Sequence, residues 1–236
     1  MQRYFVKNKS DNNLILESTD LHHIKNVMRN KPGDLIECIY NEELYICKIN
    51  DPTSNKVTII EKKEDNNELS MDITIAIALV KEQKMDLILQ KLTELGISKI
   101  IPVKMERSIV KLDDKKFEKK KERWEKICKE ASEQSKRNKI PEITKIMTIK
   151  ELTNLEYDYK LVCSTTNKTN LVNNYLQDIN KCAKIIFTVG PEGGISTKEE
   201  DFLISKGYTP ISLGSRIMRV ETAAIYIASI INFLSM

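Results

Sequence analysis

Glycines gather in one short segment, between an apolar stretch and a polar stretch. Three of the seven glycines lie within residues 190–194, directly after the buried-strand pattern of residues 184–189. Ser196 and Glu199 then match the capping box that starts a helix. Loops between a parallel strand and a helix lie at the ligand-binding edge of a sheet, and glycines let backbone groups approach a ligand. The segment predicts a ligand-binding loop, the alternative being a tight turn that binds nothing.

This glycine segment matches no known phosphate-binding pattern. Walker A requires Gly-x-x-x-x-Gly-Lys followed by Ser or Thr, and no part of the sequence fits it. Gly-x-Gly-x-x-Gly, the signature of a dinucleotide site, is also missing from the sequence. A nucleoside-type ligand would therefore need a different kind of pocket.

A second segment combines a glycine with two arginines and a carboxylate. After the strand pattern of residues 209–213 come Gly214, Arg216, Arg219 and Glu221, and then a final apolar helix. Glu221 suits the positive end of a helix dipole, whereas arginines at that end oppose it. This mild conflict favours a functional use of the arginines, such as holding a phosphate or stabilising an anion.

Positive charge is concentrated in the second part of the chain. The net charge of +4 divides into −2 over residues 1–70 (10 Lys and Arg against 12 Asp and Glu) and +6 over residues 71–236 (28 against 22). Residues 115–139 carry 11 basic and 5 acidic side chains. Such a stretch attracts phosphates or forms a solvated helix face, and charge alone does not separate these two interpretations.

Composition excludes several classes of protein. With 41% hydrophobic and 31% charged residues, the chain of 236 residues has the composition of a globular protein. Its apolar runs are too short or too mixed to span a bilayer, and its first residues lack the apolar core of a signal peptide. The five cysteines show no Cys-x-x-Cys spacing. We therefore expect reduced thiols in a cytoplasmic protein, without a disulfide framework or a metal site.

Two domains are expected to position these segments, with the polar run 62–70 at their boundary. In residues 1–69, short apolar runs alternate with turn residues, as in a small β-barrel. The strands predicted there are residues 14–16, 35–40, 44–49 and 57–60. One helix is predicted from Asp20, as its N-cap, to Met28.

Residues 70–236 alternate strand and helix patterns, which is typical of an α/β domain with a parallel sheet. The predicted strands are residues 73–80, 99–103, 160–164, 184–189 and 209–213. The predicted helices are residues 85–95, 115–138, a stretch from 196, and 221–234. Both candidate segments thus follow predicted strands.

Short motifs in a fixed order extend over nearly the whole chain. They are Arg3-Tyr4-Phe5, His22-His23-x-x-x-Val27-Met28-Arg29-x-x-Pro32-Gly33-Asp34, Lys84-Met85-Asp86, Lys91-Leu92-Thr93-Glu94-Leu95-Gly96, Glu106-Arg107-Ser108, Glu130-Ala131-Ser132-Glu133-Gln134-Ser135 with Arg137, Gly190-Pro191-Glu192-Gly193-Gly194, and Leu213-Gly214-x-Arg216-Ile217-Met218-Arg219-x-Glu221-Thr222-Ala223. Together they resemble the bacterial 16S ribosomal RNA uridine-N3 methyltransferases, a family of the SPOUT class. The departures are small: Met218 stands where leucine is more usual, and Val220 where a small polar residue is common.

The resemblance implies a fold, a cofactor and an assembly. SPOUT enzymes have an α/β fold whose knotted parallel sheet forms a C-terminal trefoil knot, and they work as homodimers. Residues 1–69 would be a PUA-like β-barrel that binds RNA, and residues 70–236 the methyltransferase domain. The residues expected around S-adenosyl-L-methionine are Gly190, Pro191, Glu192, Gly193, Gly194, Leu213, Gly214, Ile217 and Met218. The final helix, apolar on most of its surface, is the expected subunit interface, with burial inside the chain as the alternative.

The resemblance also implies a reaction and a set of RNA contacts. N3 of uracil must lose its proton, and Arg219 is expected to stabilise the resulting anion. Glu221 would orient Arg219, accept the proton, or only favour the helix start. The partner would be 16S rRNA of the small ribosomal subunit, with no metal and no membrane. Phosphate contacts are expected from Arg3, Arg29, Lys31, Arg107, Lys111 and Arg137.

Two other functions stay open at the level of sequence. One is a non-catalytic RNA-binding or ribosome-assembly protein that uses the same basic surfaces. The other is methylation of a ribose 2′-hydroxyl by a SPOUT relative. The paired glycine segments beside a basic cluster favour an enzyme, because a protein that only binds RNA does not need a cofactor cradle.

Overall fold

The computed structural model describes residues 1–112, 114–167, 169–176, 179–180 and 182–235. The chain divides into two compact units. The smaller unit contains Met1–Glu68 and Lys129–Lys139, and the larger unit contains Leu69–Cys128 and Ile140–Met236. Among the helices described, none has the length and apolar character that crossing a membrane requires.

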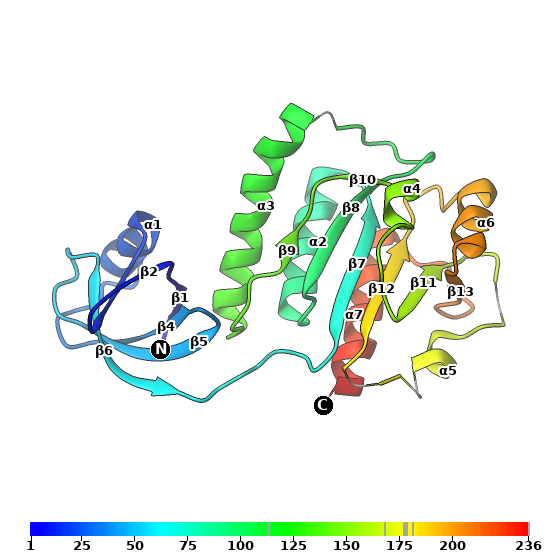
Figure 1. Cartoon of the computed structure of the whole chain (residues 1–236). Helices are drawn as coiled ribbons and strands as arrows, with labels where there is room; N and C mark the ends of the chain where they lie inside the picture. The colour runs from blue at the N-terminus through cyan, green and yellow to red at the C-terminus, as the bar shows by residue number, and fades with distance from the viewer. Residues whose placement is uncertain (113, 168, 177–178, 181, 236) are drawn as a thin grey trace. The chain divides into compact units, whose positions relative to one another are not determined.

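The smaller unit is built on a curled and mostly antiparallel sheet (Figure 1). Its strands are β1 (Arg3–Phe5), β2 (Asn8–Ser10), β3 (Asn13–Ile15), β4 (Leu35–Tyr40), β5 (Glu43–Ile49) and β6 (Lys56–Lys63). They follow the order β1-β4-β5-β6-β3-β2, in which only the β1–β4 pair is parallel. Tyr4, Leu14 and Ile36 lie in a buried core on one side of the sheet. Short apolar runs between turn residues explain why β4 and β5 were predictable.

The helix expected from Asp20 to Met28 is present, but it begins earlier than expected and its second half is not α-helical. It consists of α1 (Ser18–His22) followed by a π-helical segment, η1 (His23–Val27). The prediction that Asp20 is the N-cap was wrong, because Glu17 occupies that position and Asp20 lies inside the helix. The carboxylate of Asp20 is buried and accepts a hydrogen bond from the ammonium of Lys129 at 2.7 Å.

The larger unit contains a parallel sheet. Its strands are β7 (Asp72–Ala78), β8 (Lys99–Lys104), β9 (Glu142–Ile143), β10 (Met147–Thr148), β11 (Tyr159–Cys163), β12 (Lys184–Val189) and β13 (Thr209–Ile211). The strand order is β10-β8-β7-β12-β11-β13, with β9 also paired to β8. Every pairing recorded in this sheet is parallel, as the alternation of strands and helices predicts. The carboxyl ends of β11, β12 and β13 therefore point to the same edge.

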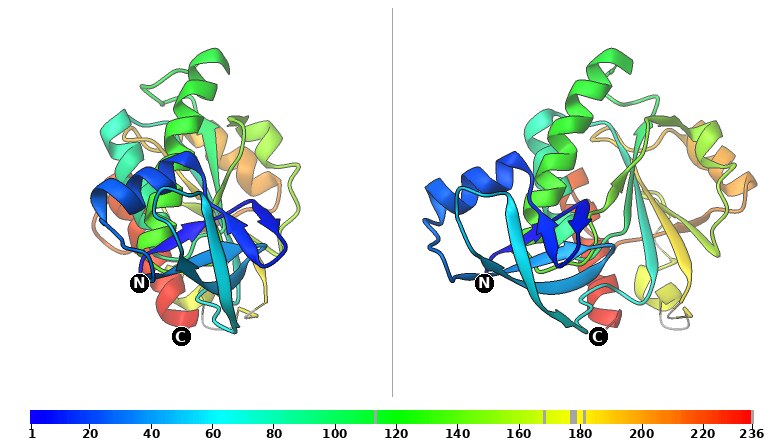
Figure 2. Two further views of the ribbon diagram at one scale, coloured as in Figure 1. Left: turned by 90° about the vertical axis from the view of Figure 1, so that its left-hand side faces the viewer. Right: turned by 60° about the vertical axis from the view of Figure 1, so that its left-hand side comes forward.

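Helices cover both faces of the parallel sheet (Figures 1 and 2). They are α2 (Glu82–Glu94), α3 (Asp114–Gln134), α4 (Ile149–Leu152), α5 (Val172–Leu176), α6 (Thr197–Ser205) and α7 (Val220–Ser235). Helices α2, α5, α7 and the first turns of α3 share one apolar cluster, whereas α4 and α6 belong to the cluster on the opposite face. Helix α7 packs against α2 and β12.

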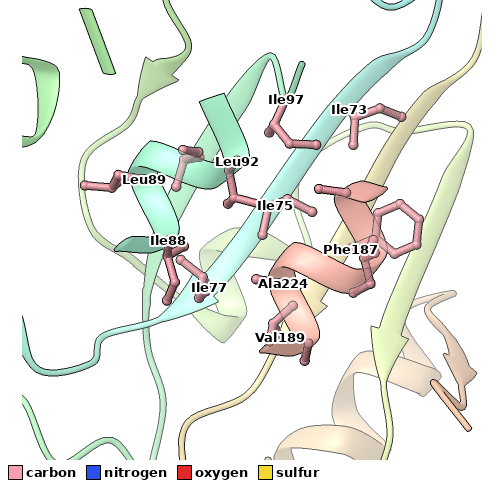
Figure 3. Packing of buried hydrophobic residues seen from close by; sticks show 14 of the residues in the cluster. Ile73, Ile75, Ile77, Ile88, Leu89, Leu92, Ile97, Phe187, Val189 and Ala224 are labelled. Atoms are coloured by element: carbon pink, nitrogen blue, oxygen red, sulfur yellow. The ribbon is translucent and has the colours of Figure 1, made fainter. Parts of the chain in front are cut away.

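The alternating side chains of β7 explain this two-sided burial. Ile73, Ile75 and Ile77 face α2 and α7, and Figure 3 shows them packed with Ala224 of α7. Ala76, on the other face, joins the cluster under α4 and α6. A strand that is apolar on both faces is the pattern of a central parallel strand, which its position between β8 and β12 fits.

Candidate functional site

A cavity of about 440 Å³ lies where the loops after β11, β12 and β13 meet. A volume of this size is within the range of small-molecule and cofactor sites. Its walls are Cys163, Ser164, Thr165, Asn167, Val189, Gly190, Pro191, Glu192, Gly194, Ile195, Glu200, Ser212, Leu213, Gly214, Ser215, Arg216, Ile217, Met218, Arg219, Val220 and Ala223. The two segments that the sequence analysis singled out therefore form opposite parts of one site.

The loop after β12 is a tight turn that leads directly into α6. The backbone N–H of Gly194 donates to the carbonyl of Pro191 at 2.8 Å, and Gly194 has a left-handed φ of +71°. The capping box at Ser196 and Glu199 starts α6, as the spacing of these residues predicts. A Cβ atom on Gly190 would lie only 2.6 Å from Cγ1 of Ile195. Glycine is thus required at position 190 for the loop to close in this form.

Arg107 braces the outer side of the same loop. Its Nη1 donates to the carbonyl oxygens of Gly193 at 3.0 Å and Ile195 at 3.4 Å. A Cβ on Gly193 would lie 3.3 Å from Cβ of Arg107, a close contact. Gly193 lines a neighbouring hollow together with Arg107, whereas the other eight residues expected around the cofactor line the cavity itself. Gly193 therefore contacts Arg107 on the side of the loop that faces away from the cavity.

The loop after β13 supplies the opposite wall. Its start is held by the backbone of the segment that follows β11: the N–H of Ser212 donates to Asn170, and that of Val172 donates to Ser212. Gly214 has a left-handed φ of +115°, which favours glycine. Leu213 and Met218 are half-buried against the core, but Ile217 is 86% exposed. An isoleucine so exposed at the rim of a cavity is available to a ligand or a partner.

Lys84 joins both walls of the cavity from the first turn of α2. Its Nζ lies 2.9 Å from Oε1 of Glu192 and 3.6 Å from Oε2 of Glu221. The hydrogen bond to Glu192 raises the pKa of Lys84. Burial acts to raise the pKa of Glu192, but the hydrogen bond and the charge of Lys84 outweigh it, so this pKa is lowered. Both groups are charged at neutral pH.

The two residues expected to be catalytic have different surroundings. Arg219 lines the cavity and is exposed. Glu221 lies in the first turn of α7, and its buried Oε2 accepts no hydrogen bond within the described part of the chain. Among the described residues, the ion-pair partner of Glu221 is Lys84 and not Arg219. Burial raises the pKa of the Cys163 thiol to about 12, so this cysteine of the cavity wall is a neutral thiol.

Two of the expected phosphate contacts have structural roles instead. Arg3 is buried, and its guanidinium donates to Glu37 at 2.9 Å and to the carbonyl of Lys136 at 2.5 Å. Arg137 is buried as well and pairs with Glu68 at 2.5 Å. Guanidinium groups that are withdrawn from water and bound to carboxylates are not available to RNA. The expectation that Arg3 and Arg137 contact phosphates is corrected for this reason.

The other expected phosphate contacts are exposed. In the smaller unit these are Arg29 and Lys31, and in the larger unit Arg107 and Lys111. Arg107 is partly engaged by the carbonyl groups of the glycine loop, which accept hydrogen bonds only from its Nη1. The side chain is exposed, so the remaining N–H groups of its guanidinium are accessible to an anion.

Sequence reasoning missed the wall that follows β11. Ser164, Thr165 and Asn167 line the cavity, and the hydroxyl of Ser164 accepts hydrogen bonds from the N–H groups of Thr166 and Asn167. The sequence feature that could have identified these residues is their position directly after the predicted strand 160–164. Without a glycine or a charge, this polar run looked like an ordinary turn. Across the described residues, no group of three or more His, Cys, Asp or Glu side chains is arranged to hold a metal ion.

Two family models match this chain. Residues 67–232 match an RNA methyltransferase domain, and residues 16–62 match an RNA methyltransferase PUA domain. Ribosomal RNA small subunit methyltransferase E of Bacillus subtilis is 35% identical, over 99% of this chain and 96% of that protein. The protein of the same name from Mesomycoplasma hyopneumoniae is 36% identical, over 96% and 97% of the two chains.

Solved structures give the same result for the fold. Ribosomal RNA small subunit methyltransferase E of Neisseria gonorrhoeae, bound to S-adenosyl methionine, superposes with a TM-score of 0.87 at 29% identity, over 99% of this chain and 98% of that one. A methyltransferase of Legionella pneumophila with bound SAM gives 0.89 at 28% identity, over 98% and 97% of the chains. With these matches over nearly its whole length, the chain belongs to the RNA methyltransferase domain family, among the proteins named ribosomal RNA small subunit methyltransferase E.

Proposed function

We propose that this protein is an S-adenosyl-L-methionine-dependent methyltransferase that methylates N3 of a specific uridine in 16S rRNA of the small ribosomal subunit. The observation that carries the proposal is the cavity formed by the loops after β11, β12 and β13, with Arg219 in its wall. The relatives are named as small-subunit rRNA methyltransferases, and two similar structures contain the same cofactor.

The residues of the cavity fit a nucleoside cofactor. Val189, Ile195 and Leu213 supply apolar surface of the kind that covers an adenine ring, while loop backbone supplies N–H and C=O groups for its polar edge. The close packing of Gly190 on Ile195 keeps the loop thin enough to leave this space open. The residues that would hold S-adenosyl-L-methionine are Gly190, Pro191, Glu192, Gly194, Leu213, Gly214, Ile217 and Met218, with Gly193 supporting the loop. When bound, the cofactor supplies an electrophilic methyl group on a sulfonium centre.

The catalytic contribution of the chain is to bind and stabilise the uracil anion. N3 lies on the pairing edge of the base, so the uridine must be unpaired when it enters. Loss of the N3 proton leaves negative charge on N3 and the flanking carbonyl oxygens, and the exposed guanidinium of Arg219 is placed to stabilise it. Glu221 pairs with Lys84 and does not line the cavity. We therefore assign Glu221 a positioning role, and the N3 proton passes to solvent water at the exposed part of the cavity where Arg219 lies.

We propose that the end of the larger unit forms the trefoil knot of SPOUT enzymes. Strand β13 lies outside β11 at the edge of the sheet, and yet the following helix, α7, packs near its centre against α2 and β12. The chain between them runs along the segment after β11, where Ser164 and Val172 bond to residues 211 and 212. Passage of the chain beneath that segment accounts for this path. Residues 1–69 would then serve as a PUA-like barrel for RNA and residues 70–236 as the methyltransferase domain.

A homodimer is part of the proposal. Much of the apolar surface of α7 is used inside the chain, since Ala224, Ile227 and Ile231 are fully buried. Phe233, however, is 74% exposed, and Tyr226 is also exposed on the outer side of the helix. Large apolar side chains left on an otherwise buried helix favour a second subunit as their cover. The rRNA substrate implies a cytoplasmic enzyme.

The test is methylation of purified small ribosomal subunits and of free 16S rRNA with methyl-labelled cofactor, followed by digestion and nucleoside analysis. The expected product is labelled 3-methyluridine. A ribose-methylated nucleoside would overturn the assignment of the base. RNA binding without transfer of any label would instead support a non-catalytic role.

A further inference from the structure

The segment from His23 to Lys31 of the smaller unit has an unusual backbone. The N–H of Met28 donates to the carbonyl of His23 at 2.9 Å, and the N–H of Asn30 donates to that of Ile24 at 3.0 Å. These bonds reach five and six residues back and widen the turn beyond an α-helix. Arg29 follows with a left-handed φ of +53°, which is uncommon for a residue with a side chain. π-Helical turns and strained residues cluster at functional sites.

The start of this segment is anchored in the unit, and its end exposes apolar side chains. Ile24 is buried in the core of the unit, and Nδ1 of His23 lies 3.0 Å from the hydroxyl of Tyr4. Val27 and Met28, in contrast, are 59% and 46% exposed. Two adjacent large apolar side chains at the end of an anchored turn form a small, rigid projection. Exposure of this apolar surface to water is unfavourable, and burial against a partner would remove the unfavourable free energy.

The charges around the projection are those of an anion-binding surface. Lys25, Arg29 and Lys31 are exposed, and no carboxylate lies within ion-pair distance of these three cations among the described residues. The nearest acid in the sequence, Asp34, is already engaged, since it accepts hydrogen bonds from the side chain of Asn30 and the backbone of Lys31. Lys25 acts on Asp51 only through longer-range charge, so the side chains of all three cations are accessible to an anion.

We propose that Val27 and Met28 form an apolar wedge that packs against unpaired bases of the substrate RNA, while Lys25, Arg29 and Lys31 hold the flanking phosphates. The inference rests on the proposed function, because it takes the RNA substrate from there, and it deepens that function by assigning a contact to bases outside the catalytic cavity. Unpaired RNA exposes base faces, on which apolar side chains pack without hydrogen-bond readout. Uncompensated cations on the same turn favour RNA over a second protein chain as the partner.

The test separates the apolar contact from the charge contact in the full-length protein. Affinity for 16S rRNA transcribed in vitro is measured by filter binding at several KCl concentrations. The variants are Val27→Ala/Met28→Ala, Arg29→Asn and the control Ile60→Ala. Asparagine tolerates the left-handed backbone of Arg29 and removes only the charge. Ile60 is 55% exposed on β6 of the same unit, so it matches Val27 in exposure.

The apolar double variant is expected to weaken RNA binding about tenfold while the salt dependence keeps its slope. Arg29→Asn is expected to weaken binding and to reduce that slope by about one unit. Ile60→Ala should bind like the wild type. Wild-type affinity in the double variant would overturn the wedge, and so would a loss of dimer mass in light scattering with RNA affinity retained, since the wedge would then be a protein interface.

Two further measurements keep this result separate from the proposed function. Binding of S-adenosylhomocysteine, measured by calorimetry, should be unchanged in the double variant if only the RNA contact is lost. If the wild type forms no 3-methyluridine but the double variant still loses RNA affinity, the proposed reaction fails and the wedge stands. If the wild type methylates 16S rRNA and the double variant binds it equally well, only the wedge fails.

Discussion

The ammonium group of Lys84 lies 2.9 Å from the carboxylate of Glu192, so the first turn of α2 is tied to the loop that follows β12. The same ammonium is 3.6 Å from Glu221 in the first turn of α7. One cation thus neutralises Glu192 in the cavity wall and Glu221, which directly follows the wall residues Arg219 and Val220 in the chain. The arrangement fixes the spacing of both walls without occupying the cavity, which Lys84 does not line.

Replacing this lysine should loosen the cofactor site. In Lys84→Met the two carboxylates lose their shared cation and repel each other, and the affinity for S-adenosylhomocysteine measured by calorimetry should fall about tenfold. Lys84→Arg should recover part of that affinity, because it restores the charge. The matched control is Lys99→Met, which breaks a 3.0 Å ion pair with Glu142 at a similar exposure. Equal affinities in Lys84→Met and Lys99→Met would show that the tie has no role in binding.

The left-handed backbone of the glycine loop provides a second prediction. Valine at Gly194 must adopt a φ near +71°, which costs about 1–2 kcal/mol, and its side chain also changes the cavity wall. Gly207 offers a control with the same backbone problem, because it has a φ of +86° and free space around its Cβ position in the turn after α6. Both variants should lose thermal stability. Only Gly194→Val should lose cofactor affinity, and a comparable loss in Gly207→Val would point to general unfolding.

Arg219 is expected to act on the reaction more than on cofactor binding. Arg219→Ala should reduce the rate of 3-methyluridine formation by roughly 10²-fold, because removing a preorganised positive charge destabilises the developing anion. The affinity for S-adenosylhomocysteine should stay within about twofold of the wild type. Lys198→Ala, on the exposed face of α6, is the control for a change of surface charge. Full activity in Arg219→Ala would remove this arginine from the mechanism.

The outer face of α7 predicts the assembly. Glutamate at Phe233 would place a charge inside the proposed interface and should convert a dimeric mass into a monomeric one in light scattering at micromolar concentration. Ile204→Glu on α6 changes another exposed apolar residue and should leave the mass unaltered. A wild-type protein that is monomeric under the same conditions would contradict the dimer itself.

Glu133 predicts how the stability of the protein depends on pH. Burial raises its pKa to about 7, opposed by Lys129 and assisted by Asp20. Because this is above the unfolded value of 4.5, the folded state binds the proton more tightly, so the stabilisation is full below pH 4.5 and is lost as pH rises through 7. Glu133→Gln cannot ionise. As the pH rises from 5 to 8, the wild type loses this stabilisation and the variant does not. The free energy of unfolding of Glu133→Gln should therefore rise by on the order of 2 kcal/mol relative to that of the wild type over this range.

Denaturant unfolding at the two pH values checks this expectation. Glu122→Gln, an exposed change on the same helix, serves as the control and should follow the wild type at both values. Parallel pH profiles for Glu133→Gln and the wild type would mean that Glu133 is ionised in the folded protein at neutral pH.

Local chemistry explains what could be predicted from the sequence. The loops after β12 and β13 were visible because glycine, a capping box and paired arginines are short-range signals, and each segment follows a strongly apolar strand. The central strand β7 was visible for the same reason. In contrast, the three-residue strand β1 pairs with a strand more than thirty positions later in the sequence, as Arg3↔Glu37, so no local pattern marks it.

Long-range partners explain what could not be predicted. Arg3 and Arg137 resemble free cations in the sequence, and their burial depends on carboxylates at Glu37 and Glu68 that only the folded chain brings close. The π-helical turn before Arg29 depends in the same way on the anchoring of His23 by Tyr4. Charge alone predicts which basic residues could contact phosphates. Their partners in the folded chain then decide which of them are structural and which are accessible to RNA.

The smaller unit is not a continuous stretch of the chain, and this limits how it can be exchanged. Residues 129–139 belong to it. They supply the carbonyl that receives Arg3 and the N–H groups of Asn138 and Lys139 that bond to Glu68. A gene segment ending at residue 69 would encode Arg3 without the carbonyl of Lys136, and Glu68 without Arg137 and these N–H groups. Recombination between relatives can therefore transfer this domain intact only if two separated stretches of the gene are inherited together.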